Sequence, residues 1–237
     1  MEVGPDETAF GVHKDLLCQH SEFFRNALKG GFKEAHEGIV KLPTETPAMF
    51  RIIHDWLNYQ TLPDFEYDVQ MVSELDLEKR EMGAVSSAGI SKMIRIYIFA
   101  DKYSMRRLKC ATLLMMETSP PGTFYFESIV KAFDELHEES ILLQYMVDDY
   151  VEQYAPSHDS EVEKTLRQVL PHNFLLRVML AAHTKLNERD KYKAVSVQDC
   201  HEHPTEEDRK YCKAKRKELE KYDDANDDSE ETDDEAS

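Results

Sequence analysis

The residues best suited to chemistry lie late in the chain, in the stretch DCHEHPTEEDRKYC. Cys200 and His203 are separated by two residues, a gap that lets a tight turn aim both side chains at one Zn²⁺ ion, and Cys212 is a third candidate ligand. A zinc finger normally has two such close pairs, and Cys212 has no near partner in the sequence. We therefore expect a polar turn and no cofactor, with a structural zinc ion as the alternative.

A second polar pair, His13-Lys14, lies between a short apolar run and two leucines in FGVHKDLLCQHSEFF. No nucleophile or carboxylate is spaced around His13 for acid–base or covalent catalysis. The pattern favours a corner where a strand turns into a helix, with His13 satisfying backbone groups there. The sequence also lacks a phosphate loop, a dinucleotide glycine pattern and a nucleophile elbow. We therefore expect that the protein is not an enzyme.

Opposite charges gather in two blocks near the end. The basic block consists of Arg209, Lys210, Lys213, Lys215, Arg216 and Lys217. An exposed helix with i, i+4 ion pairs is the favoured interpretation of this block, and a nuclear import signal is the alternative. From Asp223 to Glu235 there are nine acidic residues and no basic ones. We expect a charged helix or turn over residues 196–222 and a disordered acidic tail over 223–237.

Composition narrows the class of protein. The 237 residues carry a net charge of −18, which disfavours nucleic-acid binding by the folded body. The four cysteines are too scattered for a disulfide framework, and this favours a reducing compartment. No apolar stretch approaches the roughly 20 residues of a membrane span, and no signal-peptide pattern follows Met1. We expect no membrane association and a location in the cytoplasm, the nucleus or both.

Hydrophobic spacing predicts short strands at Phe10–Val12 and Ile39–Pro43, among mostly helical segments. Residues 64–89 are charged and weakly periodic, which indicates a loop insertion. The stretch SPPG at 119–122 cannot continue a helix, so we place a boundary there and expect a helical region over 119–195. Each helix must bury its apolar stripe against its neighbours.

Three segments together carry a family likeness: FGVHKDLLCQHSEFFRNALKGGFKEAHEGIVKLP, MFRIIHDWLNYQTL and IYIFADKYSMRRLKCATL. They resemble a BTB/POZ domain of the fungal type, from Val3 to about Glu117. The resemblance implies an α+β, mostly helical fold over residues 1–118, with a small sheet flanked by helical hairpins. It also implies a non-catalytic scaffold that contacts other proteins. The expected structural core is His13, Leu16, Leu17, Phe23, Phe24, Phe50, Trp56, Ala100, Asp101 and Tyr103.

The sequence departs from the family in two places. The first strand is reduced to residues 1–3, which leaves homodimerisation by the usual route open. The glycine that usually follows Trp-Leu-Tyr is absent, and Asn58, Tyr59 and Gln60 stand there instead.

The resemblance also implies a contact site. Cullin adaptors of this family carry a hydrophobic-x-Glu motif in a loop before the third strand, and Phe32-Lys33-Glu34 occupies that place. Phe32 either anchors a partner or packs under its own loop, and both interpretations stay open. The partners implied are proteins, including a cullin or another BTB domain. The alternatives to a plain scaffold are a substrate adaptor of a cullin-type ubiquitin ligase, with residues 124–190 as a linker or substrate-facing region, and a nuclear transcription-linked scaffold.

Overall fold

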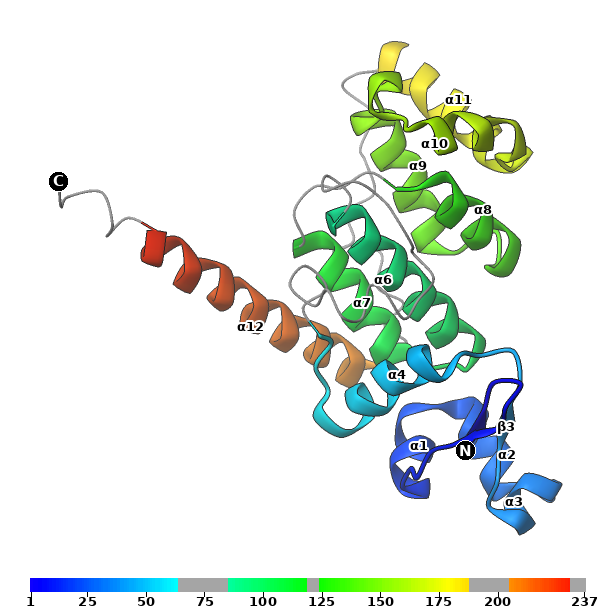
Figure 1. Ribbon diagram of the computed structural model, residues 1–237. Coiled ribbons are helices and arrows are strands. Elements are labelled where there is room, and N and C mark those ends of the chain that lie inside the picture. Colours follow the sequence, from blue (N-terminus) through cyan, green and yellow to red (C-terminus); the bar gives the residue numbers. More distant parts are fainter. Residues whose placement is uncertain (64–84, 119–123, 188–204, 231–237) are drawn as a thin grey trace, which may run out of the picture. The chain divides into compact units, whose positions relative to one another are not determined.

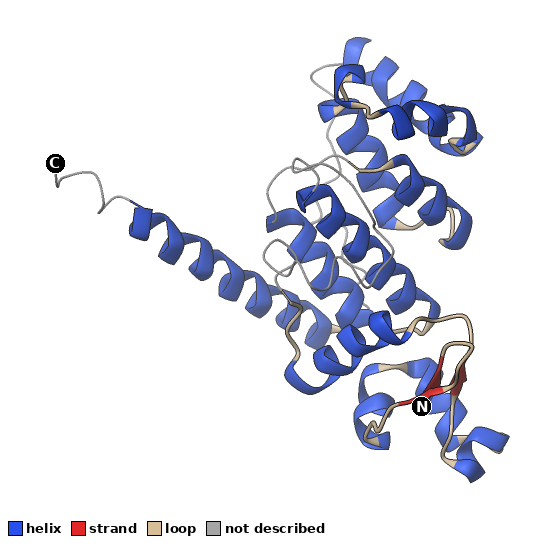
Figure 2. Cartoon of the chain, viewed as in Figure 1, coloured by secondary structure: helices blue, strands red, loops and turns tan. Residues whose placement is uncertain are grey.

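The computed structural model describes residues 1–63, 85–118, 124–187 and 205–230, and these are mostly helical with one small sheet (Figures 1 and 2). The chain divides into two compact units, Met1–Cys200 and His201–Ser237. The first elements of the first unit are β1 (Glu2–Val3), β2 (Thr8–Ala9), α1 (Lys14–His20), α2 (Glu22–Lys29), α3 (Lys33–Glu37), β3 (Lys41–Leu42) and α4 (Pro47–Tyr59). They are followed by α6 (Val85–Lys102), α7 (Arg106–Thr118), α8 (Phe126–Glu135), α9 (Ile141–Gln153), η1 (Pro156–His158), α10 (Glu161–Leu166), η2 (Arg167–Val169) and α11 (His172–Asn187). The second unit contains α12 (Glu206–Glu230).

The sheet has the strand order β2-β1-β3. Strand β1 pairs antiparallel with β2, where Glu2 faces Ala9, and parallel with β3, where Glu2 faces Lys41. The strand expected at 10–12 lies instead at 8–9, and the strand expected at 39–43 is only Lys41–Leu42. Beyond β2, the Phe10 backbone still exchanges hydrogen bonds with Met1 at 2.8 and 2.9 Å, while its ring packs against Phe50 with 4.9 Å between ring centroids.

Capping side chains set the start of the early helices. Ser21 begins α2 by accepting from the Phe24 N–H at 3.0 Å, and Thr46 begins α4 by accepting from the Met49 N–H at 3.2 Å. Pro47 occupies the first turn of α4, where its missing N–H costs no hydrogen bond. Gly30 ends α2, as its position in the sequence indicates.

The long hairpin of α6 and α7 turns at Ser104, which has a left-handed backbone conformation with φ of 51°. Sequence spacing predicts this break. Helix α6 begins at Val85, so residues 85–89 of the expected loop are helical, and the rest of that loop lies outside the described residues. Each residue added to a helix gains one backbone hydrogen bond, and this outweighs the cost of about 1 kcal/mol for Gly89 inside it.

Most of the expected core side chains are buried. Those that expose 4% of their surface or less are Leu17, Phe24, Phe50, Trp56, Ala100 and Tyr103. Leu16 and Asp101 are only partly buried, and His13 is exposed. Phe23 is 42% exposed, in contrast to its expected place in the core. Successive helical residues differ by about 100° in direction, so Phe24 faces inward and Phe23 faces the surface.

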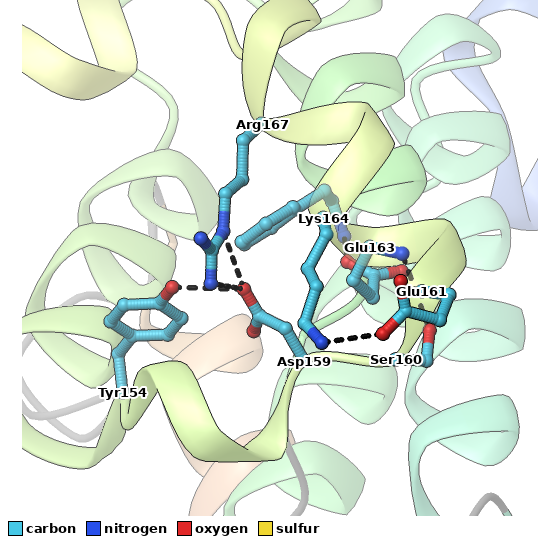
Figure 3. Close-up of polar contacts among 8 residues, drawn as sticks. Tyr154, Asp159, Ser160, Glu161, Glu163, Lys164 and Arg167 are labelled. Carbon is cyan, nitrogen blue, oxygen red and sulfur yellow. Dashed lines mark hydrogen bonds and ion pairs between the residues drawn. The ribbon is translucent and has the colours of Figure 1, made fainter.

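The helical region after residue 123 is fixed by two carboxylates (Figure 3). Asp159 accepts hydrogen bonds from the hydroxyl of Tyr154 at 2.9 Å and from Nη2 of Arg167 at 2.6 Å. Glu163 accepts from the backbone N–H of Phe126, the first residue of α8, at 2.9 Å. The Ser160 hydroxyl caps α10, because it accepts from the Glu163 N–H. Together these bonds tie α10 to α8 and hold the turn that leads into α11.

Helix α12 is longer than expected. It runs to Glu230, so residues 223–230 of the expected disordered tail are helical, and 231–237 lie outside the described residues. Three acidic residues in its first turn complement the helix dipole.

Candidate protein-contact surface

The Phe32-Lys33-Glu34 motif lies at the turn between α2 and α3. Gly30 ends α2 by donating its N–H to the Asn26 carbonyl at 3.0 Å. Phe32 is the N-cap residue of α3, and its carbonyl accepts from the Ala35 N–H at 3.1 Å. Backbone bonds on both sides therefore fix the position of Phe32, although no side chain caps α3.

The Phe32 side chain points largely into solvent. It is 62% exposed, and only one edge of its ring rests against Gly30. A Cβ atom added at Gly30 would lie 2.9 Å from a ring carbon, so the ring needs a glycine beneath it. Lys33 is turned toward Glu37 at 3.6 Å, and Glu34 is half-buried. The sequence left two interpretations of Phe32 open, an anchor for a partner or packing under its own loop. Because most of the ring is exposed, packing under the loop buries only the smaller part of it.

Two more apolar side chains are exposed close by in the sequence. Phe23 on α2 is 42% exposed, and Ile39, just before β3, is 39% exposed. The inner edge of the Phe23 ring packs edge-on against Phe24 and Tyr103, with centroid distances of 5.3 and 5.2 Å. Sequence reasoning missed Phe23 as a surface residue. The sequence does contain a signal for this: two adjacent aromatic residues on an amphipathic helix cannot both face the core.

His13 lies at the start of α1, as predicted, but its side chain does not hydrogen-bond the free backbone N–H groups of the first helical turn. The imidazole is exposed and makes no capping hydrogen bond, and only the His13 carbonyl takes part, accepting from the Leu17 N–H at 3.1 Å. This corrects its assignment to the core. The backbone rather than the side chain makes the corner, which leaves the ring in water.

A cavity of about 200 Å³ lies between the start of α4 and helices α6 and α8. Charged side chains line it, and they pair with one another: Lys102 contacts Glu45 at 2.7 Å, and Lys131 contacts Glu135. The cavity is smaller than the roughly 300–1,000 Å³ of typical small-molecule sites. The Lys102–Glu45 pair connects α6 to the β3–α4 loop, and the Lys131–Glu135 pair lies within α8.

The predicted metal ligands fall mostly outside the described residues, which exclude both Cys200 and His203. Cys212 lies in α12 and is disulfide-bonded, a state that sequence reasoning did not expect, so the disulfide would have to be reduced before this sulfur could hold zinc. Among the residues that the structure describes, no group of three metal-ligating side chains comes together. The zinc site stays a prediction.

The basic block lies on α12, in the second unit. Four of its six residues are exposed, Arg209, Lys210, Lys213 and Lys217. Others pair within the helix, as Lys215 does with Glu218 at 2.8 Å. This matches the exposed helix with local ion pairs that the sequence favours.

In the described ranges, no helix has the length and apolar character that crossing a bilayer requires.

Comparison with known proteins returns no family model, no curated protein and no solved structure that matches this chain.

Proposed function

We propose that the protein is a non-catalytic interaction module of the BTB/POZ type, and that it acts by surface recognition. The support comes from contact between two of the segments that carry the resemblance. Ser21, in HSEFF, donates its hydroxyl to the carbonyl of Tyr103, in FADKYS, at 2.6 Å. The Tyr103 ring also stacks on Phe24, with 5.4 Å between centroids. The two motifs therefore pack together in one scaffold, which supports the proposal.

The observation that carries the proposal is the exposed Phe32 ring on a fixed turn. An aromatic side chain that is already held in place loses little conformational entropy when a partner buries it. Glu34, two residues later, supplies a negative charge at the rim of such a contact. The mechanism needs no bond chemistry, because affinity comes from burying the ring.

Affinity purification from the native cell, followed by mass spectrometry, tests this proposal. We expect wild-type protein to retain specific partners and Phe32→Ala to lose at least one of them. Tyr59→Ala is the matched control, because Tyr59 is 74% exposed but lies at the end of α4. Retention of the same partners by Phe32→Ala would overturn the role of this turn.

A cullin adaptor is the second candidate, favoured by the exposure of Phe32 together with Glu34 in a hydrophobic-x-Glu motif. A purified cullin N-terminal domain should bind the wild type and bind Phe32→Ala and Glu34→Ala more weakly. If the wild type does not bind any cullin, the adaptor role is excluded and the general module remains.

A nuclear transcription-linked scaffold is the third candidate, and the exposed basic block on α12 favours it. A fluorescent fusion of the whole chain should enter the nucleus. Replacing Lys210, Lys213 and Lys217 by glutamine should prevent entry, whereas Lys33→Gln on α3 should not. Equal distribution of both variants would remove the support for this role.

A further inference from the structure

Where α1 meets α4, three side chains bring polar atoms together beneath the surface. His20, the last residue of α1, lies edge-on to the Trp56 ring with 5.3 Å between centroids. Its Nε2 atom lies 3.4 Å from Nε2 of Gln60. His20 exposes 8% of its surface and Trp56 exposes none. We call these three residues, His20, Trp56 and Gln60, the His20 cluster.

The orientation of the Gln60 amide is fixed by the end of its own helix. Gln60 ends α4 in a left-handed conformation with φ of 56°, at a position where glycine is usual. Its Nε2 donates to the carbonyls of Trp56 and Leu57, at 3.0 and 3.3 Å. Turning the amide round would place its oxygen against both carbonyl oxygens. The Gln60 NH₂ group therefore faces the His20 imidazole, and it can only donate.

This contact fits a neutral imidazole. An unprotonated Nε2 of His20 accepts from Gln60, whereas a protonated Nε2 would set two donors against each other. Three atoms of the cluster already have no hydrogen-bond partner among the described residues, and these are Nδ1 of His20, Nε1 of Trp56 and Oε1 of Gln60. Protonation would thus place a charge in a buried cluster whose polar groups are only partly satisfied, which is costly.

The charged groups around His20 give a protonated ring no partner. Arg107 on α7 acts on the imidazole as a second positive charge. On α2, Arg25 is positive as well and donates to a backbone carbonyl of α1 at 2.8 Å. The carboxylate of Glu22, at the start of α2, lies 3.7 Å from Arg106. Helix α4 contributes the two uncharged members of the cluster.

Burial, followed by the charge of Arg107, lowers the pKa of His20 from the 6.5 of an exposed histidine. A state in which the ring is exposed therefore binds more protons than the closed state once the pH falls below 6.5. The stability that neutral His20 contributes is complete above pH 6.5. It is lost as the pH falls from there through the pKa of the folded state.

We propose that the His20 cluster is a pH-sensitive latch between α1 and α4, closed while His20 is neutral and opened when His20 is protonated. Opening separates the end of α1 from Gln60 and lets water reach Trp56. Ser21, the next residue, is held by other partners, because its hydroxyl bonds to α2 and to the α6–α7 turn. The opening is consequently local. The inference is independent of the BTB/POZ proposal, since it does not involve Phe32 or any partner.

The fluorescence of Trp56 tests the latch, because this is the single tryptophan of the chain. In the full-length protein its emission should move to longer wavelength as the pH falls from about 7.5 to about 4.5, with a midpoint below 6.5. His20→Gln stays uncharged and should show no such transition. His13→Gln is the matched control, because His13 lies at the other end of α1 and its exposed side chain makes no capping bond. It should behave like the wild type.

Gln60→Glu tests the geometry of the contact. A carboxylate that faces His20 accepts from a protonated Nε2, so the midpoint of the transition should rise by about 1–3 pH units relative to the wild type. A midpoint that stays the same or falls would mean that Gln60 does not govern protonation of His20, and the latch as described would be wrong.

Far-ultraviolet circular dichroism should stay constant through the transition, because the opening is local. A change in circular dichroism that accompanies the fluorescence would mean acid unfolding of the whole protein and would overturn the proposal. So would a wild-type emission that does not change, or a transition that persists in His20→Gln. If His20→Gln does not fold, titration of the His20 ring by NMR in the wild type decides instead. A midpoint below 6.5 supports the latch, and a midpoint at or above it overturns the latch.

Discussion

The Ser21 hydroxyl donates to the carbonyl of Tyr103, 82 residues away, at 2.6 Å, while its oxygen accepts from the Phe24 N–H at 3.0 Å. One buried side chain thus caps α2 and connects it to the turn between α6 and α7. Ser21 is 1% exposed, so water cannot replace either bond. The scaffold that carries Phe32 depends on this connection, because α2 leads directly into the Phe32 turn.

Ser21→Ala should lower the free energy of unfolding by about 2–3 kcal/mol, since it removes a cap and leaves a buried carbonyl without its donor. Ser160→Ala is the matched control, because Ser160 caps α10 from an exposed position. It should cost only about 1 kcal/mol. Urea unfolding followed by circular dichroism measures both, and equal losses would show that the Tyr103 contact contributes nothing.

Gly4 should resist substitution because of its backbone conformation. Its φ is +80°, and an added Cβ would lie 3.2 Å from Cδ of Pro47. Gly4→Ala should therefore destabilise the protein by about 1–2 kcal/mol. Gly11→Ala has open space within 4 Å and should change stability by less than about 0.5 kcal/mol. Thermal unfolding compares the two variants, and a neutral Gly4→Ala would contradict this account of the β1 turn.

Asp149 on α9 should make stability depend on pH. Burial, followed by the nearby charge of Glu152, raises the pKa of Asp149 to about 6 from 3.8. The folded state therefore binds more protons than the unfolded state between these two values, and its contribution to stability falls as pH rises through this window. Asp149→Asn removes the penalty.

We expect Asp149→Asn to be more stable than the wild type by about 1 kcal/mol above pH 6.5, after allowing for partial solvent screening of this side chain. The gain should disappear near pH 4. Asp134→Asn, on the exposed side of α8, is the control and should change little at either pH. Urea unfolding at pH 4 and 7.5 measures the difference, and a gain that is the same at both values would exclude titration of Asp149 as its cause.

Local signals in the sequence predict the local structure well. Thr46-Pro47 and Ser160 mark helix starts, Gly30 marks a helix end, and all do so because a cap involves only neighbouring residues. Local signals do not distinguish Phe23 from Phe24, because the two residues are of the same type. Which of them is buried depends on how α2 packs on Tyr103.

Contacts between residues far apart in the sequence could not be predicted from the sequence. Ser160 and Glu163 have the spacing of a capping box, in which the Glu163 carboxylate would accept from the Ser160 N–H. In the structure this carboxylate accepts from the N–H of Phe126, 37 residues earlier. The position of β2 likewise depends on pairing with β1 rather than on its own residues, Thr8 and Ala9. The family resemblance implies the place of the Phe32 turn, but the sequence left open whether the ring is buried under its own loop, and in the structure it is 62% exposed.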